Sequence, residues 1–140
     1  MIVLDTNVVS ALMLRRPDAA VVDWLDRQPA ASIWTTAVTV FEIHFGLALL
    51  APGKRRKDLE EAFKRALADD LEGRVLPFEE EVAVRAATEA ARRQNGGRRV
   101  DFRDVEIAGI VAAKDATLAT RNVRHFDDLG IQVVNPWKAR

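Results

Sequence analysis

Residues 2–7 have the sequence Ile-Val-Leu-Asp-Thr-Asn, and this stretch decides the expected fold. Three apolar residues, two of them β-branched, predict a short strand buried on both faces, as in parallel sheets. Asp5, Thr6 and Asn7 end that strand with side chains that favour turns and helix caps. Because ligands bind at the carboxyl ends of strands in open α/β sheets, Asp5 is either a helix cap or a ligand-binding acid.

Short apolar runs alternate with amphipathic stretches along the rest of the chain. Further strands are expected at Ser32–Thr35, Arg74–Leu76, Ala116–Thr120 and Ile131–Val134. Helices are expected at Val8–Leu14, Asp18–Arg27, from an N-cap at Thr36 to Leu50, Lys54–Glu72, Glu79–Gln94 and Asp104–Lys114, with a turn or short helix over Arg121–Leu129. This alternation predicts an α/β fold with about five short parallel strands flanked by helices. Without a long linker or a repeat, residues 1–140 are expected to form a single domain.

The composition limits the chemistry that the chain can perform. Of its 140 residues, 49% are hydrophobic and 30% charged, as in a globular domain. The 21 Lys and Arg residues balance the 21 Asp and Glu residues, so nucleic-acid binding requires a local patch or a metal. The absence of cysteine excludes disulfides, thiolate catalysis and zinc fingers. With only two histidines, any metal must be held mainly by carboxylates, which favours Mg²⁺ or Mn²⁺.

The N-terminus gives no sign of targeting to a membrane. It lacks a positively charged region and reaches an acid at Asp5, which is unlike a signal peptide. No uncharged apolar run approaches the length of about 18 residues that a membrane span needs. We therefore expect a cytoplasmic protein.

A second acid lies among apolar residues of an expected helix. Glu42 has Val38, Thr39, Phe45 and Gly46 as its helical neighbours. A carboxylate on such a face is costly unless it is paired or coordinated. The sequence leaves two explanations open, a buried ion pair with an arginine and a metal ligand.

A third acid opens the helix expected from Asp104. Asp104 shares a face with Ile107, Ala108 and Val111, so that face is expected to pack inward. Either Asp101 or Asp104 could instead be a simple N-cap. Since a parallel sheet can bring Asp5, Glu42 and Asp104 to one cleft, a divalent cation would offset their mutual repulsion.

A polar turn after the expected strand at Ala116–Thr120 belongs to the same candidate site. Thr120 and Asn122 can hydrogen-bond a metal-bound water or a phosphate, and Arg121 can contact phosphate. An ordinary polar turn is the alternative.

These segments, taken in order, resemble the PIN-domain family, and within it the VapC/FitB-like toxins of bacterial toxin–antitoxin pairs. The resemblance is carried by residues 2–8, 39–46, 104–108 and 118–126, with Gly130 and Asn135-Pro136-Trp137 after them. It implies a PIN fold, Mg²⁺- or Mn²⁺-dependent endoribonuclease activity on RNA, a partner antitoxin and a homodimer.

The resemblance also implies roles for particular residues. The family's three acids fall on Asp5, Glu42 and Asp104, and its supporting hydroxyl falls on Thr6. Many members carry a fourth acid where this chain has Asn122, and an amide is a neutral and weaker ligand. The departure leaves open whether one or two metals are bound, and Asp127 and Asp128 are candidates to compensate.

Substrate and partner surfaces are expected on both sides of the acids. Two arginine groups could grip RNA phosphates or form an ordinary solvated face: Arg92, Arg93, Arg98, Arg99 and Arg103, and Arg121 with Arg124. His44 is expected in the core. His125 could bind RNA or cap a strand end, of which we prefer the second, and neither histidine is expected to bind a metal. An antitoxin segment could lie on an apolar surface that we expect from Leu12, Met13, Leu14, Val21, Val22, Trp24 and Leu25, with Lys54–Arg65 beside it. An arginine of that segment could reach the carboxylates and displace the metal.

Two other functions remain compatible with the sequence. One is a catalytically weak PIN module that binds an antitoxin and takes part in DNA-bound autoregulation, which the amide at Asn122 favours. The other is a metal-dependent nuclease acting on DNA flaps, which the small size of the chain disfavours.

Overall fold

The computed structural model describes residues 1–139, in which five short parallel strands form one sheet in the order β3-β2-β1-β4-β5. The strands are β1 (Ile2–Leu4), β2 (Ile33–Thr36), β3 (Val75–Leu76), β4 (Thr117–Ala119) and β5 (Gln132–Val134). The central strand is β1, which pairs with β2 on one side and with β4 on the other. The expected α/β fold with a parallel sheet is confirmed, with strand ends within a residue or two of the prediction.

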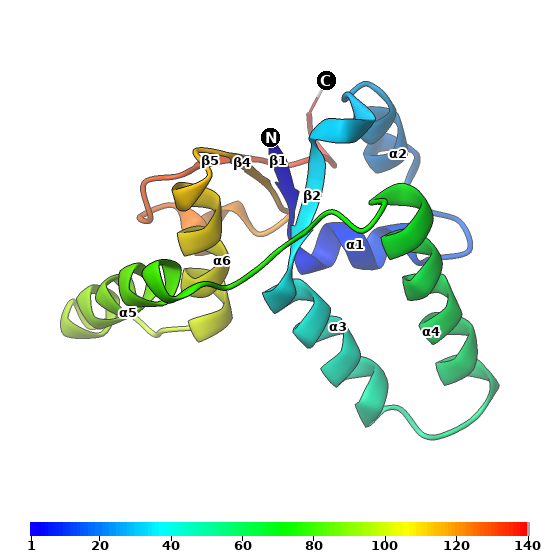
Figure 1. Ribbon diagram of the computed structural model, residues 1–140, viewed down its shortest axis with the longest axis horizontal. Coiled ribbons are helices and arrows are strands. Elements are labelled where there is room, and N and C mark those ends of the chain that lie inside the picture. Colours follow the sequence, from blue (N-terminus) through cyan, green and yellow to red (C-terminus); the bar gives the residue numbers. More distant parts are fainter. Residues whose placement is uncertain (140) are drawn as a thin grey trace.

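Helices cover both faces of this sheet (Figure 1). The α-helices are α1 (Thr6–Leu12), α2 (Ala19–Asp26), α3 (Ala37–Leu49), α4 (Lys54–Arg65), α5 (Glu80–Asn95) and α6 (Phe102–Ala113). Short helical turns lie at η1 (Ala30–Ser32), η2 (Ala66–Asp70) and η3 (Val123–Phe126). No helix among residues 1–139 is both long enough and apolar enough to cross a membrane.

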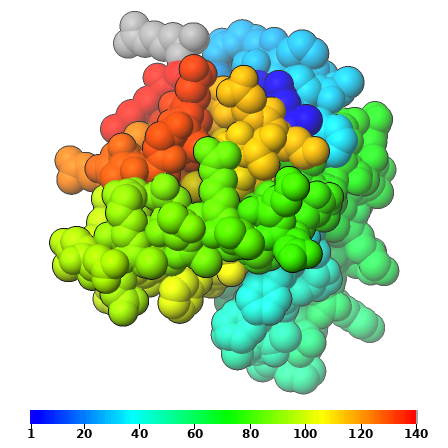
Figure 2. Space-filling view, turned by 60° about the vertical axis from the view of Figure 1, so that its left-hand side comes forward, coloured from blue at the N-terminus to red at the C-terminus, as the bar shows by residue number. Residues whose placement is uncertain are grey.

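Neighbouring residues of each strand point to opposite faces, which divides the core in two. Val3 of β1 and Leu118 of β4 pack under α5, α6 and η3. Leu4 and Ala119, the next residue of each strand, pack with α1, α2, α3 and α4. In Figure 2, α5 (yellow-green) lies across the front of the molecule, below the C-terminal segments (orange to red). Burial on both faces explains why the central strand β1 has no polar residue.

One expected helix is shorter than predicted. The sequence predicted a single helix over Lys54–Glu72, but α4 ends at Arg65 and one wide turn, η2, follows. In that turn the Leu71 amide donates to the Ala66 carbonyl at 3.0 Å, which adds one residue to the helical turn. The side chain of Leu71 is thereby fully buried, so packing in the core overrides the helical pattern.

Helices α5 and α6 approach closely at Gly109. A Cβ built there would lie 3.1 Å from Val82 Cγ1 and 3.4 Å from the Val82 carbonyl oxygen. Gly46 of α3, by contrast, has open space around it. The close contact of α5 and α6 thus favours glycine at position 109, whereas packing places no such requirement on position 46.

We predict opposite effects of the same substitution at these two glycines. Gly46→Ala should stabilise the protein by roughly 0.5–1 kcal/mol, because alanine has the higher helix propensity. Gly109→Ala should destabilise it by about 1 kcal/mol, since overpacking costs more than the propensity gain. Urea unfolding of both variants measures the difference. A Gly109→Ala variant as stable as Gly46→Ala would mean that α5 and α6 separate freely.

Candidate metal and nucleic-acid site

Asp5 lies at the carboxyl end of the central strand and is almost completely buried, with 5% exposure. Its carboxylate accepts hydrogen bonds from the Thr6 amide at 2.8 Å, Asn7 Nδ2 at 3.3 Å and Thr120 Oγ1 at 2.7 Å. It is therefore the N-cap of α1 and, at the same time, the acid of the candidate site. Burial raises the pKa of Asp5, and the three hydrogen bonds and His125 oppose that rise.

Glu42 lies in the second turn of α3 with its side chain 18% exposed. Burial raises its pKa most, and the negative charge of Asp5 adds to the rise. Arg103 Nη1 lies 3.8 Å from Glu42 Oε2 and lowers the pKa. Because Arg103 is 44% exposed and also pairs with Asp101, this contact is a loose one rather than the buried ion pair that the sequence left open.

Asp104 lies in the first turn of α6. Asp101 is the N-cap of that helix and accepts from the Arg103 amide at 3.0 Å, which leaves the Asp104 carboxylate free of capping. Burial, followed by the charge of Asp101, raises the pKa of Asp104 to about 6. His125 Nδ1 lies 3.3 Å from Asp104 Oδ2 and lowers the pKa. The inward face predicted for Ile107, Ala108 and Val111 is confirmed, because all three are buried.

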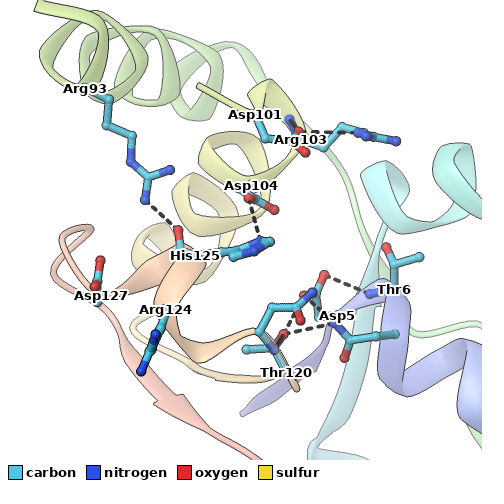
Figure 3. A network of polar contacts seen from close by, with 12 residues as sticks. Asp5, Thr6, Arg93, Asp101, Arg103, Asp104, Thr120, Arg124, His125 and Asp127 are labelled. Carbon is cyan, nitrogen blue, oxygen red and sulfur yellow. Dashed lines mark hydrogen bonds and ion pairs between the residues drawn. The ribbon is translucent and has the colours of Figure 1, made fainter. Parts of the chain in front are cut away.

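The three acids come from separate segments and are close enough to affect one another. The charge of Asp5 raises the pKa of both Glu42 and Asp104. Figure 3 shows Asp5 with Thr6 and Thr120, and Asp104 with His125 in the facing part of the network. Within residues 1–139, however, no three acidic or histidine side chains are grouped tightly enough to hold one ion between them. Each acid is instead held by its own polar neighbour.

The oxygen donors nevertheless fit a hard divalent cation. Among residues 1–139, Asp5 has no cationic partner within hydrogen-bond distance. Burial raises the pKa of all three acids, and the negative charge of Asp5 adds to the rise at Glu42 and Asp104. A divalent cation favours the charged form of such carboxylates, and Mg²⁺ and Mn²⁺ prefer oxygen ligands.

The turn after β4 contributes hydrogen bonds that hold Asp5 in place. Thr120 is fully buried, donates to Asp5, and accepts from Asn7 Nδ2 at 3.1 Å and from the Asn122 amide at 3.0 Å. Arg121 is exposed, and its guanidinium carbon lies 4.9 Å from the centre of the Trp137 ring. Asn122 is exposed and begins η3. Their predicted roles toward phosphate or water stay predictions.

Three residues of this network were not singled out from the sequence for a role at the site. Asn7 bridges Asp5 and Thr120, and its Oδ1 also accepts from the Arg121 amide at 3.0 Å. Thr39 accepts a hydrogen bond from Thr6 Oγ1 at 3.2 Å, which ties α1 to α3. His125 contacts Asp104 although a strand-end position was preferred for it. Asn7 was foreseeable from its place beside Asp5, whereas His125 depends on the tertiary fold.

Several sequence-based expectations about charged and histidine residues were wrong. Arg92, Arg93 and Arg98 do not form a free phosphate-binding face, because they pair with Glu89, Asp127 and Asp128. Asp127 and Asp128 pair with these arginines, and their compensation for the missing fourth acid stays a prediction. His44 is exposed rather than in the core, and its ring packs edge-on against Phe63 with centroids 5.2 Å apart. Phe45, one of the apolar helical neighbours of Glu42, is 52% exposed.

The strand order β3-β2-β1-β4-β5, with a buried acid at the end of β1 and two further acids on α3 and α6, is the arrangement in which the PIN-like segments of the sequence are found. The chain matches the PIN domain family over residues 2–131 and belongs to it. It is 37% identical over 138 residues to the VapC ribonuclease Y4jK of Sinorhizobium fredii, covering 99% of both chains. It is 35% identical over 137 residues to toxin FitB of Neisseria gonorrhoeae, covering 98% of this chain and 99% of FitB.

The likeness extends to solved structures. A chain in the structure of FitAB bound to an IR36 DNA fragment superposes with a TM-score of 0.86 at 34% identity, covering 100% of this chain and 98% of that one. The resemblance to the PIN family seen in the sequence is thus confirmed.

The raised pKa of Asp104 predicts a pH-dependent effect of its neutralisation. Without metal, the folded protein opposes the charge on Asp104 above about pH 6, so Asp104→Asn should melt at a higher temperature than the wild type at pH 7.5. As the pH falls through about 6, the folded wild type takes up the proton and the difference should shrink. Melting in EDTA from pH 7.5 to 5 measures it. Asp26→Asn, at the exposed end of α2, is the control; a pH-independent difference for Asp104→Asn would contradict the burial of this charge.

Proposed function

We propose that this chain is a Mg²⁺- or Mn²⁺-dependent endoribonuclease toxin that hydrolyses RNA phosphodiester bonds and is inhibited by a cognate antitoxin. The observation that carries the proposal is that Asp5, Glu42 and Asp104, from three separate segments, are all buried enough to raise their pKa values, and that the charge of Asp5 raises the pKa of both Glu42 and Asp104. The 37% sequence identity to a VapC ribonuclease, which extends over 99% of this chain, supports the same activity.

In this proposal Asp5, Glu42 and Asp104 hold the metal, directly or through water. When bound, a divalent cation polarises the phosphoryl oxygen, activates water and stabilises the leaving oxygen. Asp5 is fixed by its three hydrogen bonds, whereas the Glu42 and Asp104 side chains are 18% and 16% exposed and lie 3.8 Å from Arg103 and 3.3 Å from His125. The base that takes the proton from the attacking water would be one of the three carboxylates or a hydroxide held by the metal.

The surrounding polar residues orient the carboxylates and the substrate. Thr120 and Thr6 fix Asp5 and the start of α1 through hydrogen bonds. Arg121 presents an exposed guanidinium stacked on Trp137, which suits contact with an RNA phosphate. Asn122 lies beside it as a neutral donor and acceptor, which favours one protein-held metal, with any second ion recruited by the substrate.

We predict that Asp5→Asn abolishes RNA cleavage while the protein stays folded. Asparagine keeps the size and the capping ability of Asp5 but removes the charge, so the rate should fall by at least about 100-fold, as with other lost transition-state interactions. The measurement is cleavage of RNA by purified protein with Mg²⁺ or Mn²⁺, repeated in EDTA, which should stop it.

Asp18→Asn is the matched control for Asp5→Asn. Asp18 also caps a helix, α2, by accepting from the Ala20 amide at 2.9 Å, but it is exposed and is not one of the site carboxylates. Its substitution should leave the rate within about twofold, as expected for a surface change away from the site. Undiminished cleavage by Asp5→Asn or in EDTA would refute the proposal, whereas no cleavage by the wild type would favour the non-cleaving, antitoxin-binding module. DNA tested beside RNA addresses the flap-nuclease alternative.

A groove of about 1300 Å³ between the end of α1 and helix α4 is the proposed antitoxin site. Leu12, Met13 and Leu14 line it, and Leu14 is 57% exposed. Its walls carry charges of both signs, among them Arg55, Asp58 and Arg65, which suits an amphipathic segment. Of the surface expected from the sequence, Val21 and Trp24 belong instead to the core, at 0% and 7% exposure.

We predict that Leu14→Glu weakens antitoxin binding by at least tenfold, because it places a charge among the apolar contacts of the groove. Val84→Glu, at a 64% exposed site on α5, should leave affinity unchanged and controls for the added charge. Calorimetry with the cognate antitoxin measures both. Equal affinities for both variants would place the antitoxin elsewhere.

The remaining expectations extend this proposal. A homodimer is in keeping with an exposed apolar row on α3, formed by Phe41, Phe45 and Leu49, in which the two phenylalanine rings stack with centroids 6.0 Å apart. We further propose that residues 1–140 act as a single PIN domain and that the protein is cytoplasmic.

A further inference from the structure

Arg93, near the end of α5, is a buried guanidinium that the proposed chemistry does not use. Its side chain is 2% exposed. Nη2 donates to the His125 carbonyl oxygen and to Asp128 Oδ1, both at 2.6 Å. Its Nε is buried without a hydrogen-bond partner in the part of the chain that the structure describes. Both strong contacts thus end on one short segment, residues 123–128.

Stabilisation of the fold does not by itself account for this buried ion pair. Burying an ion pair costs desolvation, and an apolar replacement of similar volume is often as stable. The unpartnered Nε adds a further penalty. The guanidinium instead fixes the position of the 123–128 segment, because it binds a backbone oxygen and a carboxylate that are three residues apart.

A second arginine holds the same segment from the same side. Arg98 donates to the Arg124 carbonyl oxygen at 3.0 Å and pairs with Asp127 and Asp128, each at 3.0 Å. Phe126, in the middle of the segment, is 1% exposed and belongs to the core beneath α6. Residues 124–128 are therefore held at the backbone, at two carboxylates and by a buried ring.

The opposite side of the held segment presents the His125 ring to Asp104. In Figure 3 the Arg93 guanidinium meets the backbone of His125, whose imidazole reaches Asp104 in the other direction. The Nδ1 to Oδ2 distance is 3.3 Å. Because α6 packs on α5 at Gly109, α5 supports both partners of this contact.

We infer that Arg93 is a positioning residue that fixes the 123–128 segment so that His125 lies against Asp104 and orients its carboxylate. The inference rests on the proposed function, in which Asp104 holds the metal. Outer residues that orient metal ligands typically alter metal affinity by 10- to 100-fold when they are removed.

The first test compares Arg93→Met, Asp128→Asn and, as a control, Arg85→Met by NMR of the histidine rings. The chain has only two histidines, so His125→Gln assigns the signals. Arg85 is an exposed arginine of the same helix. In metal-free protein the His125 signals should move in Arg93→Met and Asp128→Asn but not in Arg85→Met. Since the first two variants change the local charge in opposite senses, a shift in the same direction reports displacement of the ring.

The same samples are then titrated with Mg²⁺. The wild type and Arg85→Met should bind equally, and Arg93→Met at least tenfold more weakly, in line with other outer residues. If Arg93→Met does not fold, Asp128→Asn, whose side chain is 27% exposed, carries the comparison. Unmoved His125 signals, or unchanged Mg²⁺ affinity in folded variants, overturn the inference.

Cleavage rates separate action through His125 from a general loss of structure. The Arg93→Met/His125→Ala double variant should cleave RNA within about twofold of His125→Ala, because coupled residues are not additive. If the double variant instead loses activity by the product of the two single-variant losses, the inference is overturned. If the proposed function is wrong, the wild type neither binds Mg²⁺ nor cleaves RNA. The histidine NMR signals of the metal-free protein then still decide whether Arg93 positions His125.

Discussion

The structure depends on a carboxylate that is buried at the end of the central strand and satisfied from the far end of the chain. Asp5 receives the Thr120 hydroxyl, 115 residues away, and the same hydroxyl accepts from Asn7. This small network joins β1, α1 and the turn after β4 at the edge where the other acids arrive. It keeps a charged group ionisable in a place where burial alone would oppose its charge.

The sequence predicts the fold well because strand burial and helix caps are local signals. Ile2–Leu4 and the acid after it define the central strand, and Thr36 caps α3 as expected by accepting from the Thr39 amide. What could not be predicted depends on contacts between distant segments. The wide turn at Ala66–Asp70 exists because Leu71 is drawn into the core. His44 and Phe45 face outward because α3 buries a narrower face than its apolar composition indicates.

The candidate site shows the same division. Its three acids could be found from the sequence, since each follows a strand or interrupts an apolar face. The fate of the arginines could not be, because Arg93 and Arg98 meet Asp127 and Asp128 only after α5 folds beside η3. Arginines that the sequence suggested for nucleic-acid binding instead form ion pairs within the protein. Other arginines of the predicted phosphate-contacting groups are exposed, among them Arg103, Arg121 and Arg124.

The long span between Asp5 and Thr120 has a consequence for synthesis of the protein. A nascent chain on the ribosome makes α1 and α3 well before it makes β4, and until then Asp5 lacks the hydroxyl that fixes it. Parallel pairing of β1 with β4 is a late, long-range step. A ribosome-tethered fragment that ends before β4 therefore lacks the hydroxyl that fixes Asp5, so the candidate site is completed only after most of the chain has left the ribosome.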